Sequence, residues 1–244
     1  MKIIPLSEGA FTVDASKKFI PFNNEDNLQQ RPEGSLLVEI QPFVVVTNKD
    51  VILLDTGLGF TNADGTLQLH QNLMDKGIDP KSVTKILLSH LHKDHSGGIS
   101  MKDKTIVSFP GATYYINEKE YEFALQKGEP SYLVEDFNIL SKSGKVEFTS
   151  DNGSIDNIIE YQLTGAHCPY HQAFWIKEDG ETIFFGGDVA PQLIQMKTKF
   201  VAKYDYDGKK CSELRQQWWQ QGEKEGWTFL FYHDIKTAVF NFKK

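Results

Sequence analysis

The stretch Ser89-His90-Leu91-His92-Lys93-Asp94-His95-Ser96-Gly97-Gly98 places three imidazoles and a carboxylate within six positions of the chain. It follows a short apolar run that predicts a buried strand ending at this cluster. Because side chains alternate along a strand, His90 and His92 project to the same side, and the following turn brings Asp94 and His95 inward. Imidazole with carboxylate suits zinc or another divalent first-row metal better than calcium or magnesium. The stretch therefore predicts a metal site that needs further ligands.

The composition is that of an ordinary globular protein, with 40% hydrophobic residues in 244 positions, and we expect one domain over 1–244. No apolar run approaches the roughly 20 residues that span a bilayer, so we expect no membrane association. The net charge of −7 and the lack of a dense basic block disfavour nucleic acid as a partner. Cys168 and Cys211 are too few for a disulfide framework and favour a cytoplasmic location. We expect a monomer or homodimer that acts on a small molecule.

Short β-branched and aromatic runs alternate with a few helical segments along the chain. Strands are predicted at 43–47, 51–55, 86–89, 113–116, 146–148, 158–163, 172–177, 182–185 and 227–232. Helices are predicted at 67–76, 117–126 and 212–224, the second opened by a capping box of Asn117 and Glu120. In both halves strands come first, then a helix and a strand, which suits two stacked sheets with helices outside. The segment 128–144 is either a surface loop or a helical cap over a pocket, and we favour the cap.

Three more polar residues each follow a predicted strand. His167 follows 158–163, Asp188 follows 182–185 after two glycines, and His233 ends the last strand. Taken singly, either histidine is more often a hydrogen-bonded core residue, and Asp188 is explained equally well as a turn cap. Their shared position at strand ends, where open α/β sheets place their chemistry, favours one common site.

These residues fall into five motifs whose order resembles the metallo-β-lactamase superfamily. The motifs are Asp55-Thr56-Gly57, His90-Leu91-His92-Lys93-Asp94-His95, Gly165-Ala166-His167, Gly187-Asp188 and Tyr232-His233. The second motif is highly specific, and the others support it by order and position. The resemblance implies an α/β protein with the four-layer αβ/βα sandwich of that family, with the metals in a groove at the sheet ends.

The resemblance also implies a division of roles around two divalent metal ions, zinc first, with manganese or iron as alternatives. The implied ligands are His90, His92 and His167 for the first metal, Asp94, His95 and His233 for the second, and Asp188 for both. Asp55 matches the family aspartate that orients a ligand without binding metal. His171 falls at a family position that is not a ligand, so we assign it a supporting role.

The implied chemistry is hydrolysis by a hydroxide that bridges the two metals, with Asp94 as the catalytic residue that orients it and carries the proton. The aspartate at 188 disfavours true β-lactamases, and the ending Tyr232-His233-Asp234 resembles the compact lactonase and phosphotriesterase-like branch. The tyrosine that acyl-homoserine lactonases carry after the bridging aspartate has no counterpart here. Tyr170 and Tyr232 are the candidates to replace it.

Aromatic residues near the site favour a small, uncharged ester or lactone as substrate. The candidates for the substrate pocket are Phe19, Phe22, Tyr132, Phe137, Tyr170 and Tyr232, although each of these is more often plain core. Alternatives remain open: a phosphotriester or phosphodiester hydrolase, or a persulfide dioxygenase that holds one iron with His90, His167 and Asp188. A non-catalytic binding module is disfavoured because all seven ligands are present.

Overall fold

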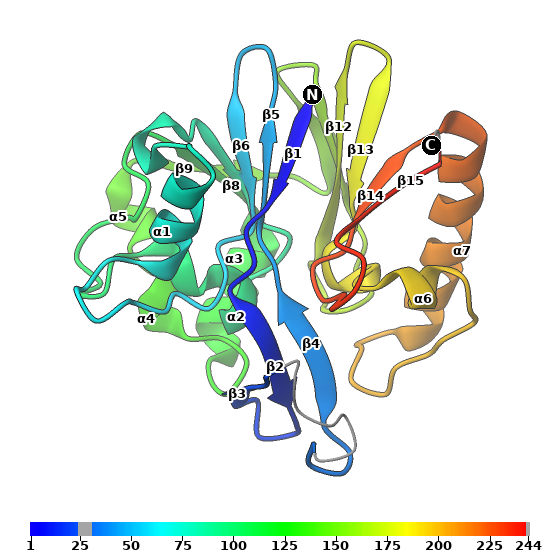
Figure 1. Ribbon diagram of the computed structural model, residues 1–244, viewed down its shortest axis with the longest axis horizontal. Coiled ribbons are helices and arrows are strands. Elements are labelled where there is room, and N and C mark those ends of the chain that lie inside the picture. The colour runs from blue at the N-terminus through cyan, green and yellow to red at the C-terminus, as the bar shows by residue number, and fades with distance from the viewer. Residues whose placement is uncertain (24–30, 243–244) are drawn as a thin grey trace.

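The computed structural model describes residues 1–23 and 31–242. Two six-stranded sheets stand face to face in the middle of the molecule, and helices cover their outer faces (Figure 1). This confirms the four-layer αβ/βα sandwich that the family resemblance implied, and the two stacked sheets that the order of elements indicated. Within the described residues, no helix combines the length and the apolar character that a membrane crossing requires.

The first sheet has the strand order β1-β5-β6-β7-β8-β9. Its strands are β1 (Lys2–Pro5), β5 (Phe43–Val46), β6 (Val51–Leu54), β7 (Lys85–Leu87), β8 (Thr113–Asn117) and β9 (Val146–Thr149). Strands β6 to β9 run parallel, and β5 pairs with β6 in the predicted antiparallel hairpin. The helices on this half are α1 (Gln68–Asp75), α2 (Lys93–Ser96), α3 (Glu118–Lys127), α4 (Val134–Phe137) and α5 (Leu140–Ser143), with 3-10 turns η2 (Pro80–Ser82) and η3 (Gly97–Ile99).

The second sheet has the strand order β10-β11-β12-β13-β14-β15. Its strands are β10 (Asn152–Ile155), β11 (Ile159–Leu163), β12 (Gln172–Glu178), β13 (Glu181–Phe185), β14 (Thr228–Leu230) and β15 (Val239–Asn241). Only β13 and β14 pair in parallel. This half carries η4 (Gly187–Val189), α6 (Leu193–Met196) and the long α7 (Gly208–Glu225).

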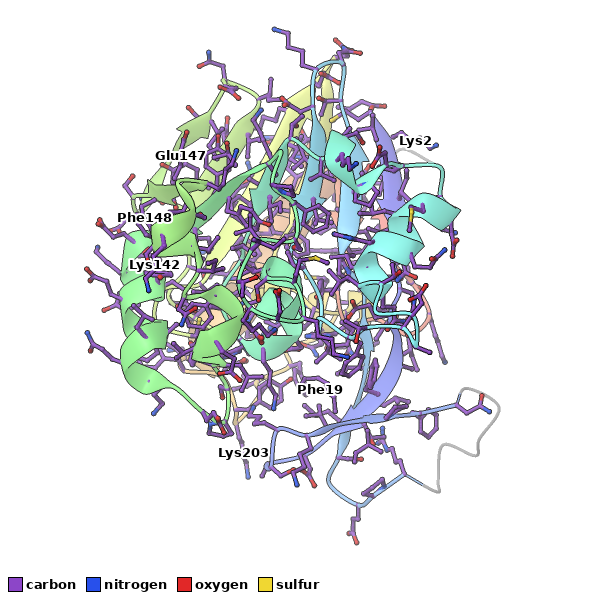
Figure 2. All side chains as sticks on the ribbon, turned by 90° about the vertical axis from the view of Figure 1, so that its left-hand side faces the viewer. Lys2, Phe19, Lys142, Glu147, Phe148 and Lys203 are labelled. Atoms are coloured by element: carbon purple, nitrogen blue, oxygen red, sulfur yellow. The ribbon has the colours of Figure 1, made fainter. Side chains whose placement is uncertain are left out.

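A small third sheet extends from one end of the sandwich. It consists of β3 (Phe19–Pro21), β2 (Gly9–Val13) and β4 (Leu36–Ile40), in that order. In Figure 2 it projects below the rest of the molecule, with Phe19 on the side that faces the body. The sheet thereby forms a wall beside the strand ends where the polar motifs lie.

The core has three layers because the central strands are buried on both faces. On β6, Ile52 and Leu54 pack into the cluster between the two sheets, whereas Leu53 points outward under the helices of the first half. Phe174 and Phe185 of the second sheet complete the central cluster. A third cluster lies beneath α7. Two-sided burial explains why these strands appear in the sequence as continuous apolar runs.

The structure confirms most predicted elements and corrects several. Helix α7 begins at Gly208, four residues before the predicted start, because the Asp207 side chain caps it by accepting from Lys210 N at 2.9 Å. Strands β1 to β4, β10 and β15 were not predicted. The segment 128–144 contains two short helices, but Phe137 and Leu140 pack into the core of the first half. Of this segment only Ser131 lines the described pocket, so the helices form mainly part of the core and not a cap over the pocket.

Glycines let the histidine motif approach the Asp55-Thr56-Gly57 loop closely. Thr56 N donates to the carbonyl of His95 at 2.8 Å, and Gly97 N donates to that of Gly57 at 2.9 Å. A Cβ added at Gly59 would overlap the carbonyl of Gly97. Backbone-to-backbone contact at this junction therefore depends on residues without side chains.

We predict that Gly59→Ala lowers the free energy of unfolding by about 1–3 kcal/mol more than Gly144→Ala does, measured by urea denaturation. Both glycines have positive φ, +72° and +64°, but a Cβ at Gly144 meets open space. Both variants carry the backbone strain of a positive φ, and only Gly59→Ala adds steric overlap, so their difference measures the overlap. Equal losses for the two variants would contradict the proposed close contact.

Candidate metal centre

The seven predicted ligands meet where the strands of both sheets end, and they form two groups. The first group consists of His90, His92, His167 and Asp188, whose ligand atoms all lie within 4.8 Å of one another. His92 Nδ1 lies 2.9 Å from His90 Nε2 and 3.1 Å from His167 Nε2. Three ring nitrogens therefore converge on one point, together with Asp188 Oδ2, which is 3.2 Å from His167 Nε2.

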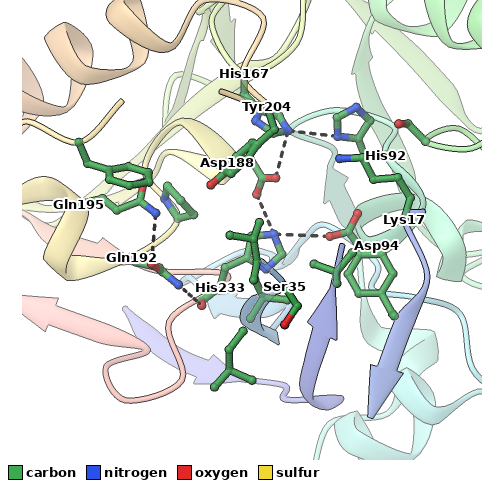
Figure 3. A pocket seen from close by; sticks show the side chains of 18 of the residues that line it. Lys17, Ser35, His92, Asp94, His167, Asp188, Gln192, Gln195, Tyr204 and His233 are labelled. Atoms are coloured by element: carbon green, nitrogen blue, oxygen red, sulfur yellow. Dashed lines mark hydrogen bonds and ion pairs between the residues drawn. The ribbon is translucent and has the colours of Figure 1, made fainter. Parts of the chain in front are cut away.

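The second group consists of Asp94, His95 and His233. Asp94 Oδ2 lies 3.6 Å from His95 Nε2 and 3.5 Å from His233 Nε2. Asp188 reaches this group with its other oxygen, because Oδ1 lies 3.1 Å from His95 Nε2 and 3.0 Å from His233 Nε2. One carboxylate therefore presents one oxygen to each group, which is the arrangement a bridging ligand requires (Figure 3).

Four of the five imidazoles are fixed through Nδ1. The rings of His95 and His167 donate from Nδ1 to Asp55 Oδ2 at 2.7 Å and to Asp205 Oδ1 at 2.8 Å, respectively. His233 Nδ1 donates to the backbone carbonyl of Glu39 at 2.7 Å. The fourth bond joins His90 Nδ1 to Ser89 Oγ at 3.0 Å. These bonds leave Nε2 of all four rings directed at the centre, whereas His92 presents Nδ1.

Charge and burial oppose each other at this centre. Although burial favours the neutral acid, the imidazoles of His233 and His95 hold the pKa of Asp188 well below its ordinary value. Conversely, burial disfavours protonation of His95, but the carboxylates, Asp188 foremost, raise its pKa well above the usual value. Burial, followed by neighbouring imidazoles, lowers the pKa of His90 well below the usual value. The carboxylates thus favour the protonated form of His95, whereas burial favours the neutral form of His90.

The donor atoms fit divalent metal ions. His95 Nε2 and Asp188 Oδ1 are buried without a hydrogen-bond partner among the described residues, although they lie 3.1 Å apart. Buried polar atoms without partners are costly, and a cation between them would satisfy both. The donor set of five imidazoles and two carboxylates is nitrogen-rich, which suits zinc-like ions and not calcium or magnesium.

Asp55 and His171 lie behind the ligands. Asp55 is fully buried and has a positive φ of +56°, and its carboxylate also accepts from Ser89 N and Ser89 Oγ, both at 2.7 Å. His171 Nε2 accepts from the backbone N–H of Asp188 at 3.1 Å. Asp55 thus orients His95, and His171 fixes the turn that carries Asp188.

A pocket of about 330 Å³ opens onto both groups. On one side it is walled by the small third sheet and by α2, with Lys17, Phe19 and Lys93. On the other side lie α6 and the loop that follows it, with Gln195 and Tyr204. Figure 3 shows Lys17, Gln195 and Tyr204 around Asp188 and Asp94, so the pocket gives access to the centre.

The comparison with known proteins agrees with this geometry. The sequence profile of the metallo-beta-lactamase superfamily matches residues 39–233. The chain belongs to this superfamily. It is 29% identical over 185 residues to N-acyl homoserine lactonase AttM of Agrobacterium fabrum (strain C58), a match covering 69% of this chain and 64% of the lactonase. It is 24% identical over 151 residues to human acyl-coenzyme A thioesterase MBLAC2, covering 57% of this chain and 53% of the thioesterase. The matches thus span less than two thirds of these relatives.

Two solved structures share nearly the whole architecture of this chain. A probable metal-dependent hydrolase from Staphylococcus aureus has a TM-score of 0.82 at 18% identity, covering 99% of this chain and 92% of that one. The dizinc quorum-quenching lactonase AidC, in complex with a product, has a TM-score of 0.73 at 21% identity, covering 97% of this chain and 88% of that one. At these identities the likeness establishes the fold.

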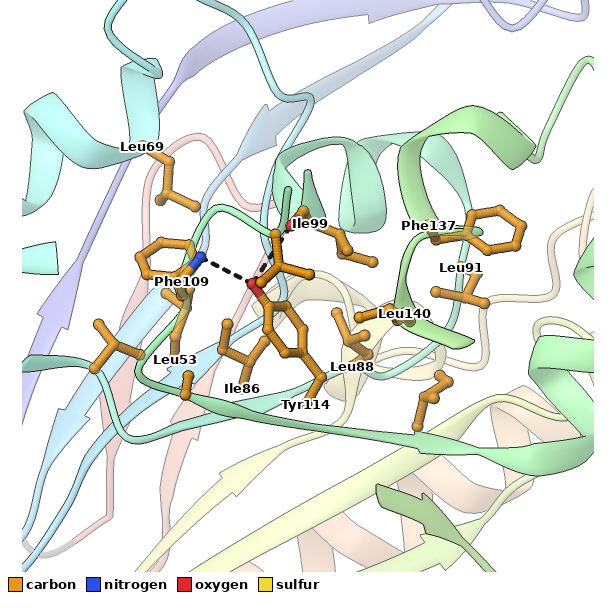
Figure 4. Packing of buried hydrophobic residues seen from close by; sticks show 14 of the residues in the cluster. Leu53, Leu69, Ile86, Leu88, Leu91, Ile99, Phe109, Tyr114, Phe137 and Leu140 are labelled. Carbon is orange, nitrogen blue, oxygen red and sulfur yellow. Dashed lines mark hydrogen bonds between the residues drawn. The ribbon is translucent and has the colours of Figure 1, made fainter. Parts of the chain in front are cut away.

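Of the six aromatic candidates for the pocket, the structure places only Phe19 on its described lining. Phe137 is fully buried in the core of the first half (Figure 4). Tyr132 is also buried and contacts the back of His92, with ring centroids 4.8 Å apart. Tyr232 lies beneath the centre, stacked on His95 at 4.1 Å, and donates to the backbone carbonyl of Asp94 at 2.7 Å.

The remaining two candidates also lie off the described pocket lining. The half-buried Phe22 pairs through its backbone with Ala10, and the Tyr170 ring contacts Phe123 at 5.8 Å. Aromatic side chains near the motifs are more often part of the hydrophobic core than of a pocket wall. Of the six aromatic residues expected in the pocket wall, Phe19 is therefore the one that the structure places there.

Sequence reasoning missed Asp205, Tyr204 and two buried glutamates. Glu120, predicted to close a capping box, instead turns inward and accepts from the backbone N–H of Leu91 at 3.0 Å. Glu8 Oε2 accepts from Leu58 N at 2.7 Å, while Glu8 Oε1 is buried without a partner among the described residues. Burial raises the pKa of Glu120 to about 7 and that of Glu8 to about 8. Neither residue has a sequence signal that distinguishes it from a surface glutamate.

We predict that Glu8→Gln gains stability relative to the wild type as the pH rises from 5 to 8. The pKa of Glu8 is raised from 4.5 to about 8 in the folded state, so its contribution is complete below pH 4.5 and is lost as the pH rises through 8. The difference reaches at most about 5 kcal/mol. Urea denaturation at several pH values measures it, with the exposed Glu33→Gln as the control. Parallel pH profiles for Glu8→Gln and the wild type would exclude this role for Glu8.

Proposed function

We propose that this protein is a hydrolase that requires two divalent metal ions and cleaves small esters or lactones. The observation that carries the proposal is the Asp188 carboxylate, whose two oxygens face two complete ligand groups on the floor of one pocket. The similarity to lactonases and to a thioesterase, all enzymes named for cleaving an acyl bond, supports the same class of reaction.

We assign the ligands as the resemblance to the superfamily implied them. The first metal would be held by His90, His92 and His167, the second by Asp94, His95 and His233, and both by Asp188. Bound there, the two ions would lower the pKa of water to roughly 7 and so supply a nucleophile at neutral pH. We propose zinc, with manganese or iron as alternatives, and metal analysis of the purified protein tests this assignment.

The chain's own residues have two further tasks in this proposal. Asp94 lies on the pocket lining, where its carboxylate accepts a proton from the attacking water and passes it to the leaving oxygen. Tyr204 also lines the pocket, and burial followed by the charge of Asp205 raises the pKa of its phenol, which stays protonated. Tyr204 therefore replaces Tyr170 and Tyr232 as the hydroxyl that donates to the substrate oxygen.

The alternatives have less support from the geometry. A single-iron dioxygenase would use His90, His167 and Asp188, yet Asp94, His95 and His233 form a second group beside them. A phosphotriester or phosphodiester substrate would use the same centre, and direct assays distinguish it from an ester. We further propose that the chain acts as one domain, as a monomer or homodimer, and in the cytoplasm, where Cys168 and Cys211 remain free thiols.

We predict that His90→Ala and Asp94→Asn each lower kcat/KM for a lactone or aryl ester by about 10²-fold or more, because one removes a metal ligand and the other the proton carrier. Circular dichroism should show that both variants are folded. The exposed Asp103→Asn serves as the control for Asp94→Asn. Full activity in either centre variant would refute the assignment.

We predict that Tyr204→Phe lowers kcat by about 10-fold to 10²-fold with a smaller change in KM, since the donated hydrogen bond strengthens in the transition state. Tyr206→Phe is the matched control, because Tyr206 lies two positions further on, is 69% exposed and is not among the pocket-lining residues. Steady-state kinetics of both variants on the same ester give kcat and KM for the comparison. Equal kcat values for the two variants would remove Tyr204 from the mechanism.

A further inference from the structure

The pocket is cationic apart from the metal centre. Its charged lining residues outside the ligand groups are Lys17, Arg31 and Lys93. Among the described residues, the only carboxylates on the lining are Asp94 and Asp188, which belong to the centre. This excess of positive charge contrasts with the net charge of −7 for the whole chain.

Lys17 is directed into the pocket by the turn between β2 and β3. The backbone N–H of Lys17 donates to the carbonyl of Asp14 at 3.0 Å, and Ser16 N donates to Asp14 Oδ1 at 2.9 Å, which fixes the turn. The Lys17 side chain is half-buried and extends towards His92 (Figure 3). The next residue, Lys18, is exposed and does not line the pocket. One lysine of this pair therefore faces the pocket, and its neighbour faces solvent.

The pocket cations form no salt bridge with a carboxylate of the described residues. Within residues 1–23 and 31–242, neither Lys17, Arg31 nor Lys93 forms an ion pair. The Lys93 ammonium instead lies 5.9 Å from the centre of the Phe19 ring. An ammonium in a partly enclosed pocket attracts an anionic group much more strongly than it would in open water. The wall that contains Lys17 and Lys93 thus favours binding of a negatively charged group of a ligand.

The opposite wall, which carries Gln195 and Tyr204, also presents apolar surface. Ile194 of α6 and Phe200 of the following loop line the pocket and remain 62% and 39% exposed. An aliphatic chain laid against them would remove this apolar surface from water. The metal centre lies between the two walls, so a substrate that uses both has a charge at one end, an aliphatic chain at the other and its scissile bond between.

We propose that the substrates are aliphatic acyl esters whose alcohol part carries a carboxylate or a phosphate, with this anion bound by Lys17 and the acyl chain on Ile194 and Phe200. This rests on the proposed hydrolase function and deepens it. Water adds its oxygen to the acyl carbon, the ester C–O bond breaks, and the proton passes to the released alcohol. The charged lining thus favours an anionic substrate over the uncharged ester or lactone that the aromatic content of the sequence favoured.

Three hexanoyl esters test the proposal on the metal-loaded protein: those of glycolamide, glycolic acid and 2-hydroxyethyl phosphate. The first two differ almost only in charge, and the third separates phosphate from carboxylate. We expect kcat/KM for the glycolate ester to exceed that for the glycolamide ester by about tenfold. Lys17→Met, which keeps the aliphatic stem, should reduce this ratio towards one. Lys18→Met should retain the wild-type ratio.

Binding of non-ester analogues gives a second readout that does not need turnover. Calorimetry compares N-hexanoylglycine with N-hexanoylglycinamide on the wild type, Lys17→Met and Lys18→Met. Any coordination of the carboxylate by metal occurs in all three proteins and cancels in the comparison, which leaves the contribution of Lys17. We expect the preference for the anion to fall about tenfold in Lys17→Met alone.

The two proposals fail in different ways. If the neutral esters are cleaved but charge has no effect, or if Lys17→Met keeps the wild-type ratio, the anionic substrate is overturned and the hydrolase stands. If none of the esters or lactones is cleaved, the hydrolase is overturned, and the calorimetric comparison still decides whether Lys17 binds the anion. A larger preference for the phosphate ester than for the glycolate ester would assign the anion as phosphate.

Discussion

Hydrogen bonds to Nδ1 of the imidazoles determine which ring nitrogens face the metal centre. A neutral imidazole has one donor and one acceptor nitrogen, so fixing Nδ1–H on an oxygen leaves Nε2 as the metal-binding atom. Asp55, Asp205 and the carbonyl of Glu39 impose this choice on His95, His167 and His233. Each of these oxygens depends on a different part of the fold, and so the whole sandwich must form before the nitrogens face one point.

The ligands could be predicted from the sequence because each ligand motif lies shortly after an apolar strand. Their supports could not be predicted in the same way. Asp205 is 38 residues from His167 and lies in a loop with no periodic signal, and Glu39 contributes a backbone carbonyl that no side-chain pattern encodes. The pocket residues Lys17 and Tyr204 likewise reach the centre through tertiary contacts alone.

The same distinction applies to the fold. Central strands such as β6 and β12 were predictable because burial requires continuous apolar residues. Strand β10, with three of its four residues exposed, lacks that pattern and was missed. Glu120 shows the limit of a local motif, because the Asn117 side chain caps α3 as predicted while the glutamate is drawn into the interior by the backbone N–H of Leu91. The local capping motif therefore predicted the helix correctly but not the direction of the Glu120 side chain.

The ligands come from both halves of the sandwich, so the metal centre lies where the two halves meet. His95 follows a strand of the first sheet, Asp188 follows a strand of the second, and their side chains meet across the seam at 3.1 Å. An ion held by these two side chains would connect the two halves. Its binding energy would then oppose their separation, and the stability of the fold would depend on the metal concentration.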